Sequence, residues 1–212
     1  MAKSETEQTR ANRLRTPGKR QRLRVRVFRP LAIEIGWLAY EWNRLHEAMA
    51  ELFADIVTQG NVGVGFSIWY STTNERAQRD MLRAAVEATY RPQNEKPKQH
   101  GDIMWLLNQL NELGGRRNNI IHSPFVFVND LSVGEIEILP HYFFGNPRAT
   151  ELRDKSLLEE FKWCRDQLSR LAYFAEQLHY AMAFPDDFPW PARPQLPTRD
   201  HFKRQLARSR KK

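Results

Sequence analysis

The chain has 212 residues, 41% of them hydrophobic and 27% charged, which is typical of a globular domain with polar appendages. Its single cysteine, Cys164, excludes an intramolecular disulfide framework and a cysteine-based zinc site. The polar first ten residues contain no secretory signal, and no apolar run approaches the ~18 residues that span a bilayer. We therefore expect a cytoplasmic protein with no membrane partner.

The net charge of +8 is concentrated at the two ends of the chain. Residues 1–29 carry ten Lys or Arg and two Glu, residues 185–212 carry eight Lys or Arg and three Asp, and residues 30–184 have an excess of five acids. Such basic ends are frequent handles for nucleic acid, and the alternative is that they are solvated tails. We expect a disordered basic arm at 1–29, a helical domain at 30–184 and a Pro-rich, then basic, tail at 185–212.

Apolar residues at spacings of three and four predict four principal helices. The first is expected to begin at Pro30, because proline is tolerated at the first helical position, and to end at the glycine-containing connector 60–65. The second is expected to open with a capping box in which Ser71 or Thr72 pairs with Glu75.

The third helix carries its apolar stripe over residues 103–113 and is expected to kink or end at Gly114-Gly115. Alternating residues then predict a β-hairpin at about 125–139, with its turn around Asn129-Asp130. A long fourth helix is expected over 150–183. The predicted fold class is therefore all-α: a four-helix bundle with a short β-hairpin insertion and basic, flexible termini.

The fourth helix has a second apolar flank beside its core stripe. Two interpretations stay open for this flank, a wider intramolecular core or a dimer surface. Five of the twelve prolines then fall between Pro185 and Pro197, which predicts an extended tail that Phe188 and Trp190 could strap onto the body. The aromatic residues of the second flank are Trp163, Tyr173, Phe174 and Tyr180.

None of the six histidines has the spacing of a metal site, so we expect neither metal nor cofactor. The segment around Arg117 is different, because Arg117 continues the apolar stripe of the third helix four places after Leu113. A guanidinium at a core position needs an anion, a carboxylate or a subunit interface. His122 follows, just before Ser123-Pro124. Arginine for a phosphate and histidine for a proton form a reasonable ribonuclease pair.

The run Arg117-Asn118-Asn119-Ile120-Ile121-His122 resembles the signature of the HEPN superfamily (higher eukaryotes and prokaryotes nucleotide-binding domain), whose nucleases carry Arg, a polar residue that is often Asn, three more residues and His. The resemblance covers residues 30–184 and implies a helical bundle that acts as a metal-independent, homodimeric ribonuclease. By this resemblance Arg117 holds the scissile phosphate, His122 is the general base or acid, and Asn118 orients the pair.

The resemblance also implies auxiliary residues and partners. Arg116 stands at a permitted spacing from the histidine as well, and Asn119 lies within the motif. Some family nucleases add an acid about six positions before the arginine, where this chain has Asn111 followed by Glu112. Family nucleases often serve as toxins or in antiphage defence, which implies an antitoxin or regulatory protein partner.

These observations predict an endoribonuclease that cleaves single-stranded RNA by attack of the ribose 2′-hydroxyl on the adjacent phosphorus. The alternative is a non-catalytic HEPN-like module that binds a nucleotide, an RNA or a protein. A third hypothesis is a helical nucleic-acid adaptor that acts through its basic arms.

Overall fold

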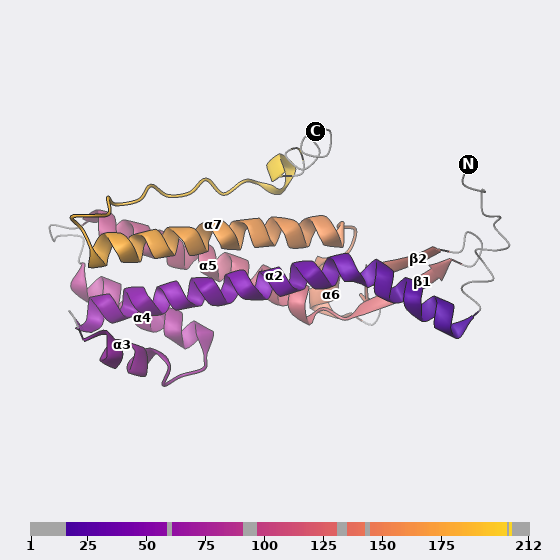
Figure 1. Cartoon of the computed structure of the whole chain (residues 1–212), viewed down its shortest axis with the longest axis horizontal. Coiled ribbons are helices and arrows are strands. Elements are labelled where there is room, and N and C mark those ends of the chain that lie inside the picture. Colours follow the sequence, from indigo (N-terminus) through magenta and orange to yellow (C-terminus); the bar gives the residue numbers. More distant parts are fainter. Residues whose placement is uncertain are drawn as a thin grey trace. The chain divides into compact units, whose positions relative to one another are not determined.

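The computed structural model describes residues 16–58, 61–90, 97–130, 135–142, 145–202 and 204. These residues form helices and one two-stranded antiparallel sheet (Figure 1), so the predicted mostly helical fold with a hairpin is confirmed. Residues 1–15 of the predicted arm, and residues 203 and 205–212 of the predicted tail, lie outside the described residues. In chain order the elements are α2 (Pro17–Thr58), α3 (Val62–Trp69), α4 (Glu75–Thr89), α5 (Pro97–His122), β1 (Phe125–Asp130), β2 (Glu135–Pro140), α6 (Pro147–Glu151) and α7 (Leu157–Ala183).

The chain divides into two compact units. Unit 1 comprises Met1–Trp37 and Arg116–Lys162, and unit 2 comprises Leu38–Gly115 and Trp163–Lys212. Helices α2, α5 and α7 each contribute residues to both units.

Helix α2 begins at Pro17, so the prediction that it starts at Pro30 and that residues 17–29 are disordered is wrong. Pro30 lies inside the helix and is exposed, and it removes one hydrogen bond to the carbonyl of the preceding turn. The helix persists because its opposite face is packed within unit 1. Leu31 is 6% exposed, and the Phe28 ring lies edge-on to Phe127 of β1 at 6.4 Å between centroids. Tertiary contacts therefore outweigh the local proline signal.

The hairpin of unit 1 pairs β1 with β2 so that Phe125 lies opposite Pro140 and Asp130 opposite Glu135. The predicted turn around Asn129-Asp130 is wrong, because both residues are paired within β1. A hairpin of two strands is marginal by itself. Aromatic contacts anchor this one, since Phe125 packs on buried Phe161 with 6.1 Å between ring centroids.

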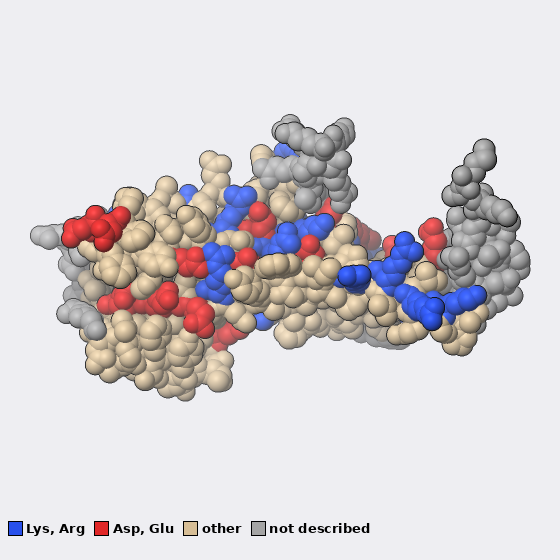
Figure 2. Space-filling model, viewed as in Figure 1, with Lys and Arg blue, Asp and Glu red and all other residues tan. Residues whose placement is uncertain are grey.

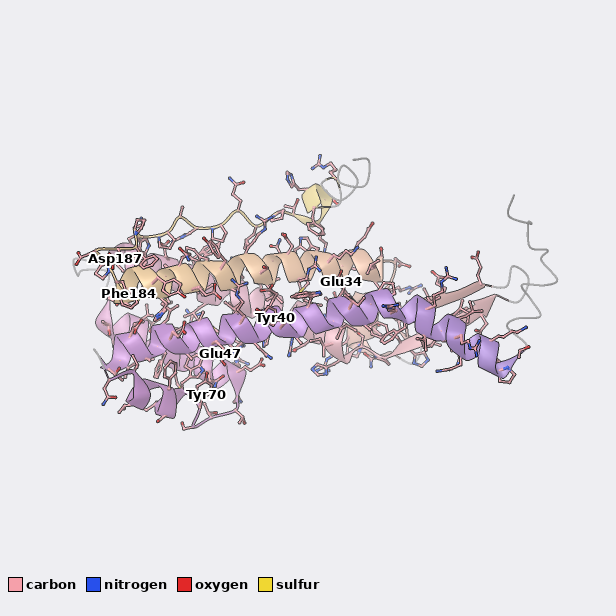
Figure 3. The ribbon with its side chains drawn as sticks, viewed as in Figure 1. Glu34, Tyr40, Glu47, Tyr70, Phe184 and Asp187 are labelled. Atoms are coloured by element: carbon pink, nitrogen blue, oxygen red, sulfur yellow. The ribbon has the colours of Figure 1, made fainter. Side chains whose placement is uncertain are left out.

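In unit 2, the connector predicted at 60–65 is partly wrong because helix α3 begins at Val62. A Cβ atom on Gly65 would lie 2.5 Å from Ala54 Cα, so glycine is needed for the close approach of α3 to α2. Trp69 at the end of α3 packs on Phe53, and the Tyr70 hydroxyl donates a hydrogen bond to Glu47 Oε2 at 3.3 Å (Figure 3).

Three further predicted boundaries are wrong. Asn74, and not Ser71 or Thr72, caps α4, because its Oδ1 accepts from the backbone N–H groups at N2 and N3. Helix α5 continues through Gly114-Gly115 to His122. The predicted start of the fourth helix at Thr150 falls instead in the short helix α6, and α7 begins at Leu157 after a turn in which Asp154 has φ of 59°.

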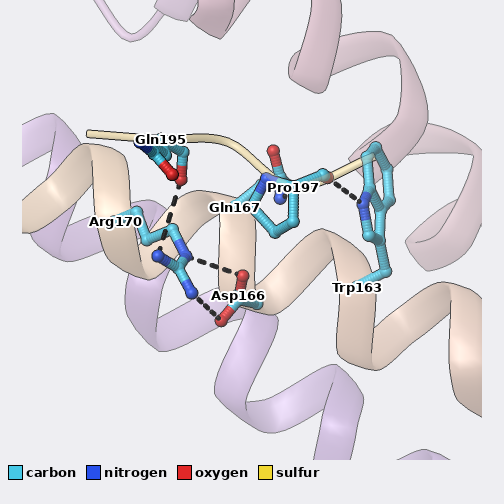
Figure 4. A network of polar contacts seen from close by, with 6 residues as sticks. All are labelled: Trp163, Asp166, Gln167, Arg170, Gln195 and Pro197. Atoms are coloured by element: carbon cyan, nitrogen blue, oxygen red, sulfur yellow. Dashed lines mark hydrogen bonds and ion pairs between the residues drawn. The ribbon is translucent and has the colours of Figure 1, made fainter. Parts of the chain in front are cut away.

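The C-terminal segment of unit 2 runs back alongside α7 as an extended chain (Figure 1), as predicted. The Trp163 indole and the Gln167 amide both donate to Pro197 O, at 2.9 and 3.2 Å (Figure 4). Trp190 donates to Asp102 Oδ2 on α5 at 2.7 Å, and Phe188 stacks on Tyr180 with 5.3 Å between centroids. The predicted strap is thus present.

The same packing bears on the second aromatic flank of α7. Trp163 is 6% exposed and Phe174 is 2% exposed, the latter edge-on to Trp105 of α5 at 5.5 Å. Both residues therefore belong to the core of unit 2, as the wider-core interpretation predicts. Tyr173 and Tyr180 remain exposed, at 59% and 40%.

Candidate ribonuclease site

Arg117 lies on the inward stripe of α5. The residues before and after it on this stripe, Leu113 and Ile120, are 5% and 0% exposed, and Arg117 itself is half-buried. Because the helix continues through the two glycines, Arg117 falls on the inward stripe, as the spacing predicts. Its Nη1 donates a hydrogen bond of 2.9 Å to Asn118 Oδ1, the residue expected to orient it. Arg116 is also half-buried but stands about 100° further around the helix.

His122 is the last residue of α5, and its side chain is exposed. The chain then turns through Ser123 and Pro124 into β1, because the residue before a proline avoids the helical region. Ser123 is 6% exposed, and its Oγ has no hydrogen-bond partner among the described residues. The motif therefore ends on an exposed imidazole about 1.4 turns after Arg117 and about 140° around the helix from it.

The hairpin brings a second histidine to this end of α5. The backbone N–H of His141 donates to Pro124 O at 2.7 Å, which extends the β1–β2 ladder by one pair beyond Phe125 and Pro140. Residues that face each other across an antiparallel ladder lie roughly 5 Å apart between Cα atoms. His141 thus lies opposite Pro124, which follows His122 by two residues, and it is half-buried. Sequence reasoning missed it, although the correct hairpin register would have found it.

The remaining candidates are divided between the two units. Asn119 is half-buried in unit 1 with the motif, whereas Asn111 and Glu112 are exposed and belong to unit 2. Asn111 Oδ1 accepts a 3.0 Å hydrogen bond from Nε of Arg79 on α4. Burial lowers the pKa of Arg79, and Asn111 gives this guanidinium an acceptor. Asn111 therefore contacts α4 within unit 2.

Three observations bear on other classes of site. In the described part of the chain, no group of three or more His, Cys, Asp or Glu side chains is arranged to hold a metal ion. None of the described helices is both long and apolar enough to cross a membrane. Cys164 is buried on α7, as expected of a small core residue.

Comparisons with known proteins add no assignment. No family model, curated protein or solved structure matches the chain.

Proposed function

We propose that the protein is a metal-independent endoribonuclease of the HEPN type, with its helices arranged as a four-helix bundle, that cleaves single-stranded RNA. The observation that carries the proposal is the position of Arg117. A half-buried guanidinium on the inward stripe of α5, held by Asn118 and followed by the exposed imidazole of His122, suits an anionic ligand with a proton to transfer.

The charge of unit 1 supports an RNA ligand. Residues 16–37 and 116–162 contain twelve Lys or Arg and eight Asp or Glu, so the part of the chain that holds the motif is net positive. Phosphate attraction is therefore available on the same unit as the motif, although the span 30–184 as a whole is acidic.

The proposed reaction is a transesterification within the RNA backbone. His122 takes the proton of a ribose 2′-hydroxyl, the 2′-oxygen attacks the adjacent phosphorus, and the bond from phosphorus to the 5′-oxygen breaks. Arg117 balances the charge that develops on the phosphate oxygens, and Asn118 keeps its guanidinium oriented through the 2.9 Å hydrogen bond. His141 protonates the leaving 5′-oxygen. The products end in a 2′,3′-cyclic phosphate and a 5′-hydroxyl, and DNA is not cleaved because it lacks the nucleophile.

The family resemblance leads us to propose a homodimer in which two motifs face one cleft. The dimer cannot depend on Trp163 and Phe174, since both are buried within unit 2. A monomer by light scattering at micromolar concentration, with full activity, would refute it. A role as a toxin or in antiphage defence, under control of an antitoxin or regulatory protein, belongs to the same proposal.

One observation favours the second candidate, a non-catalytic module that binds RNA, a nucleotide or a protein. At the place where some family nucleases carry an acid, this chain has Asn111, and Asn111 is bonded to Arg79 in unit 2. In that case Arg117 and His122 hold a ligand without transferring a proton.

Incubation of the purified chain with labelled single-stranded RNA in EDTA separates the two candidates. A nuclease loses cleavage on Arg117→Ala or His122→Ala and keeps it on Arg116→Ala and on the surface control His201→Ala, which lies in unit 2. RNA that stays intact while still binding would support the non-catalytic module instead.

A further inference from the structure

The outward face of the first turns of α2 is a continuous row of cations. Helix geometry of 100° per residue puts these side chains within an arc of about 80°. Figure 2 shows Lys and Arg side chains gathered over this part of α2, and each of the four is exposed. The row, called here the cationic stripe, consists of Lys19, Arg22, Arg26 and Arg29.

The opposite face of the same turns is fixed to the hairpin of unit 1. The Arg24 guanidinium lies 5.3 Å from the centroid of the Phe127 ring, and the Phe28 ring packs on the same side chain. The stripe is therefore presented by a helix that is already docked. Phe28, the largest apolar side chain of these turns, is packed on the hairpin and is not free to insert into a membrane.

The stripe ends in exposed apolar residues on the same face. Ile33 is 51% exposed and Trp37 is 49% exposed, and both continue the arc of the four cations. The first acidic residue of the described chain, Glu34, is buried at 6% and does not share the surface. From Lys19 to Trp37 the face extends about 27 Å, at 1.5 Å per residue. A row of cations followed by an aromatic ring is the pattern by which proteins bind single strands without reading sequence.

We propose that this face of α2 binds single-stranded RNA, with the four cations on successive phosphates and Trp37 stacked on a base. The ligand class rests on the proposed function, but binding itself requires no cleavage. The RNA would be held by the unit that carries Arg117 and His122, since β1, on which α2 packs, begins three residues after His122. The stripe thus supplies affinity without sequence preference, and the motif supplies the chemistry.

The contribution of the stripe to RNA affinity can be estimated from the salt dependence of binding. The logarithm of affinity falls with the logarithm of salt concentration by about 0.7 for each phosphate neutralised on a single strand. Four engaged cations therefore contribute about 3 to the slope, which corresponds to a roughly 50-fold loss of affinity between 50 and 200 mM salt.

The test uses a fluorescent 20-nucleotide 2′-O-methyl RNA, which cannot be cleaved by attack of its blocked 2′-oxygen. Binding to the full chain is measured by anisotropy from 50 to 200 mM KCl. The variant Lys19→Gln/Arg22→Gln/Arg26→Gln/Arg29→Gln should lower the slope by about 3. A matched control that removes the same charge from exposed positions elsewhere, Arg76→Gln/Lys98→Gln/Arg148→Gln/Arg204→Gln, should keep the slope within about 1 of the original.

Glutamine is a good helix former, so α2 should persist, and circular dichroism checks it. If the quadruple variant does not fold, the pairs Lys19→Gln/Arg22→Gln and Arg26→Gln/Arg29→Gln should each lower the slope by about 1.4. Trp37→Ala should weaken binding at least 5-fold at every salt concentration with an unchanged slope, and Trp37→Phe should largely restore it.

Equal slopes for the stripe variant and its control would overturn the proposal. So would stripe-dependent binding to phosphatidylserine vesicles by a chain that does not bind the RNA, which would identify a membrane surface instead. Failure of the nuclease gives a different result, because the stripe then still binds the 2′-O-methyl RNA while unmodified RNA stays intact.

Discussion

Asp102 on α5 holds the extended C-terminal segment of unit 2, and Asp102→Ala tests how firmly. Asp102 is 5% exposed. Its Oδ2 accepts a hydrogen bond from Trp190 Nε1 at 2.7 Å, and its Oδ1 accepts one from Arg193 Nε at 2.5 Å. Removing the carboxylate leaves both donors without their acceptor. A hydrogen bond to a charged group contributes about 1.5–3 kcal/mol, and the half-exposed Arg193 is at the lower end because solvent screens it. We expect Asp102→Ala to weaken the attachment of the C-terminal segment by about 2–4 kcal/mol of free energy.

This loss should first release the segment that follows α7 rather than unfold the whole chain. The Trp163 indole, which donates to Pro197 O at 2.9 Å, should become accessible as the segment leaves. Limited proteolysis should therefore cut Asp102→Ala between residues 185 and 200 much faster than the unaltered chain, with a lower thermal midpoint. Glu87→Ala is the matched control, because it removes one carboxylate from an exposed position on α4 at little cost in stability. Equal proteolysis and equal midpoints for the two variants would refute the anchoring role.

Three other predictions concern single side chains. The hydrogen bond that His179 Nδ1 donates to Asp55 Oδ2, at 2.7 Å, raises the pKa of His179. The stability that this contact contributes is therefore complete below the ordinary pKa of 6.5 and lost as pH rises through the raised pKa. His179→Asn should flatten the pH dependence of the urea midpoint between about pH 6 and 8.5, and an unchanged profile would contradict this. Gly115→Ala should stabilise α5 by about 0.5–1 kcal/mol, since its Cβ meets nothing within 4 Å, whereas Gly65→Ala should destabilise by about 1–3 kcal/mol. Thermal midpoints that move in the same direction would contradict one of these two expectations. His141→Gln should lower kcat about 100-fold with little change in RNA affinity; a weaker Kd at normal kcat would show a binding role instead.

The helices were predictable from sequence because their apolar faces repeat every three to four residues over long stretches. The ends of these helices were not predictable where a tertiary contact outweighs a local sequence signal. Pro30 lies within α2 because the turn around it is packed on the hairpin. Gly114 lies within α5, buried beside the Trp42 ring, so it does not mark a helix end.

The candidate site was predictable in part for the same reason. The stripe of α5 placed Arg117 inward, since helical periodicity carries through to Ile120. His141 could not be found that way, because its position depends on the hairpin register, and the predicted turn residues Asn129-Asp130 are paired within β1. The cationic stripe could not be predicted, because the charge of residues 1–29 indicated only a disordered arm. In the structure the stripe lies on a helix whose Phe28 packs on Phe127 of the hairpin.

The most direct test of the proposed function is the identity of the nucleophile. Once a cleavage site in RNA is mapped, the ribose on the 5′ side of that bond is replaced by 2′-deoxyribose and the digest is repeated in EDTA. If Arg117 and His122 act as proposed, the cut at that bond disappears while other sites are still cut, and the unmodified RNA yields 2′,3′-cyclic phosphate ends. Cleavage at the deoxy position, or products with a 5′-phosphate, would contradict transesterification by this site.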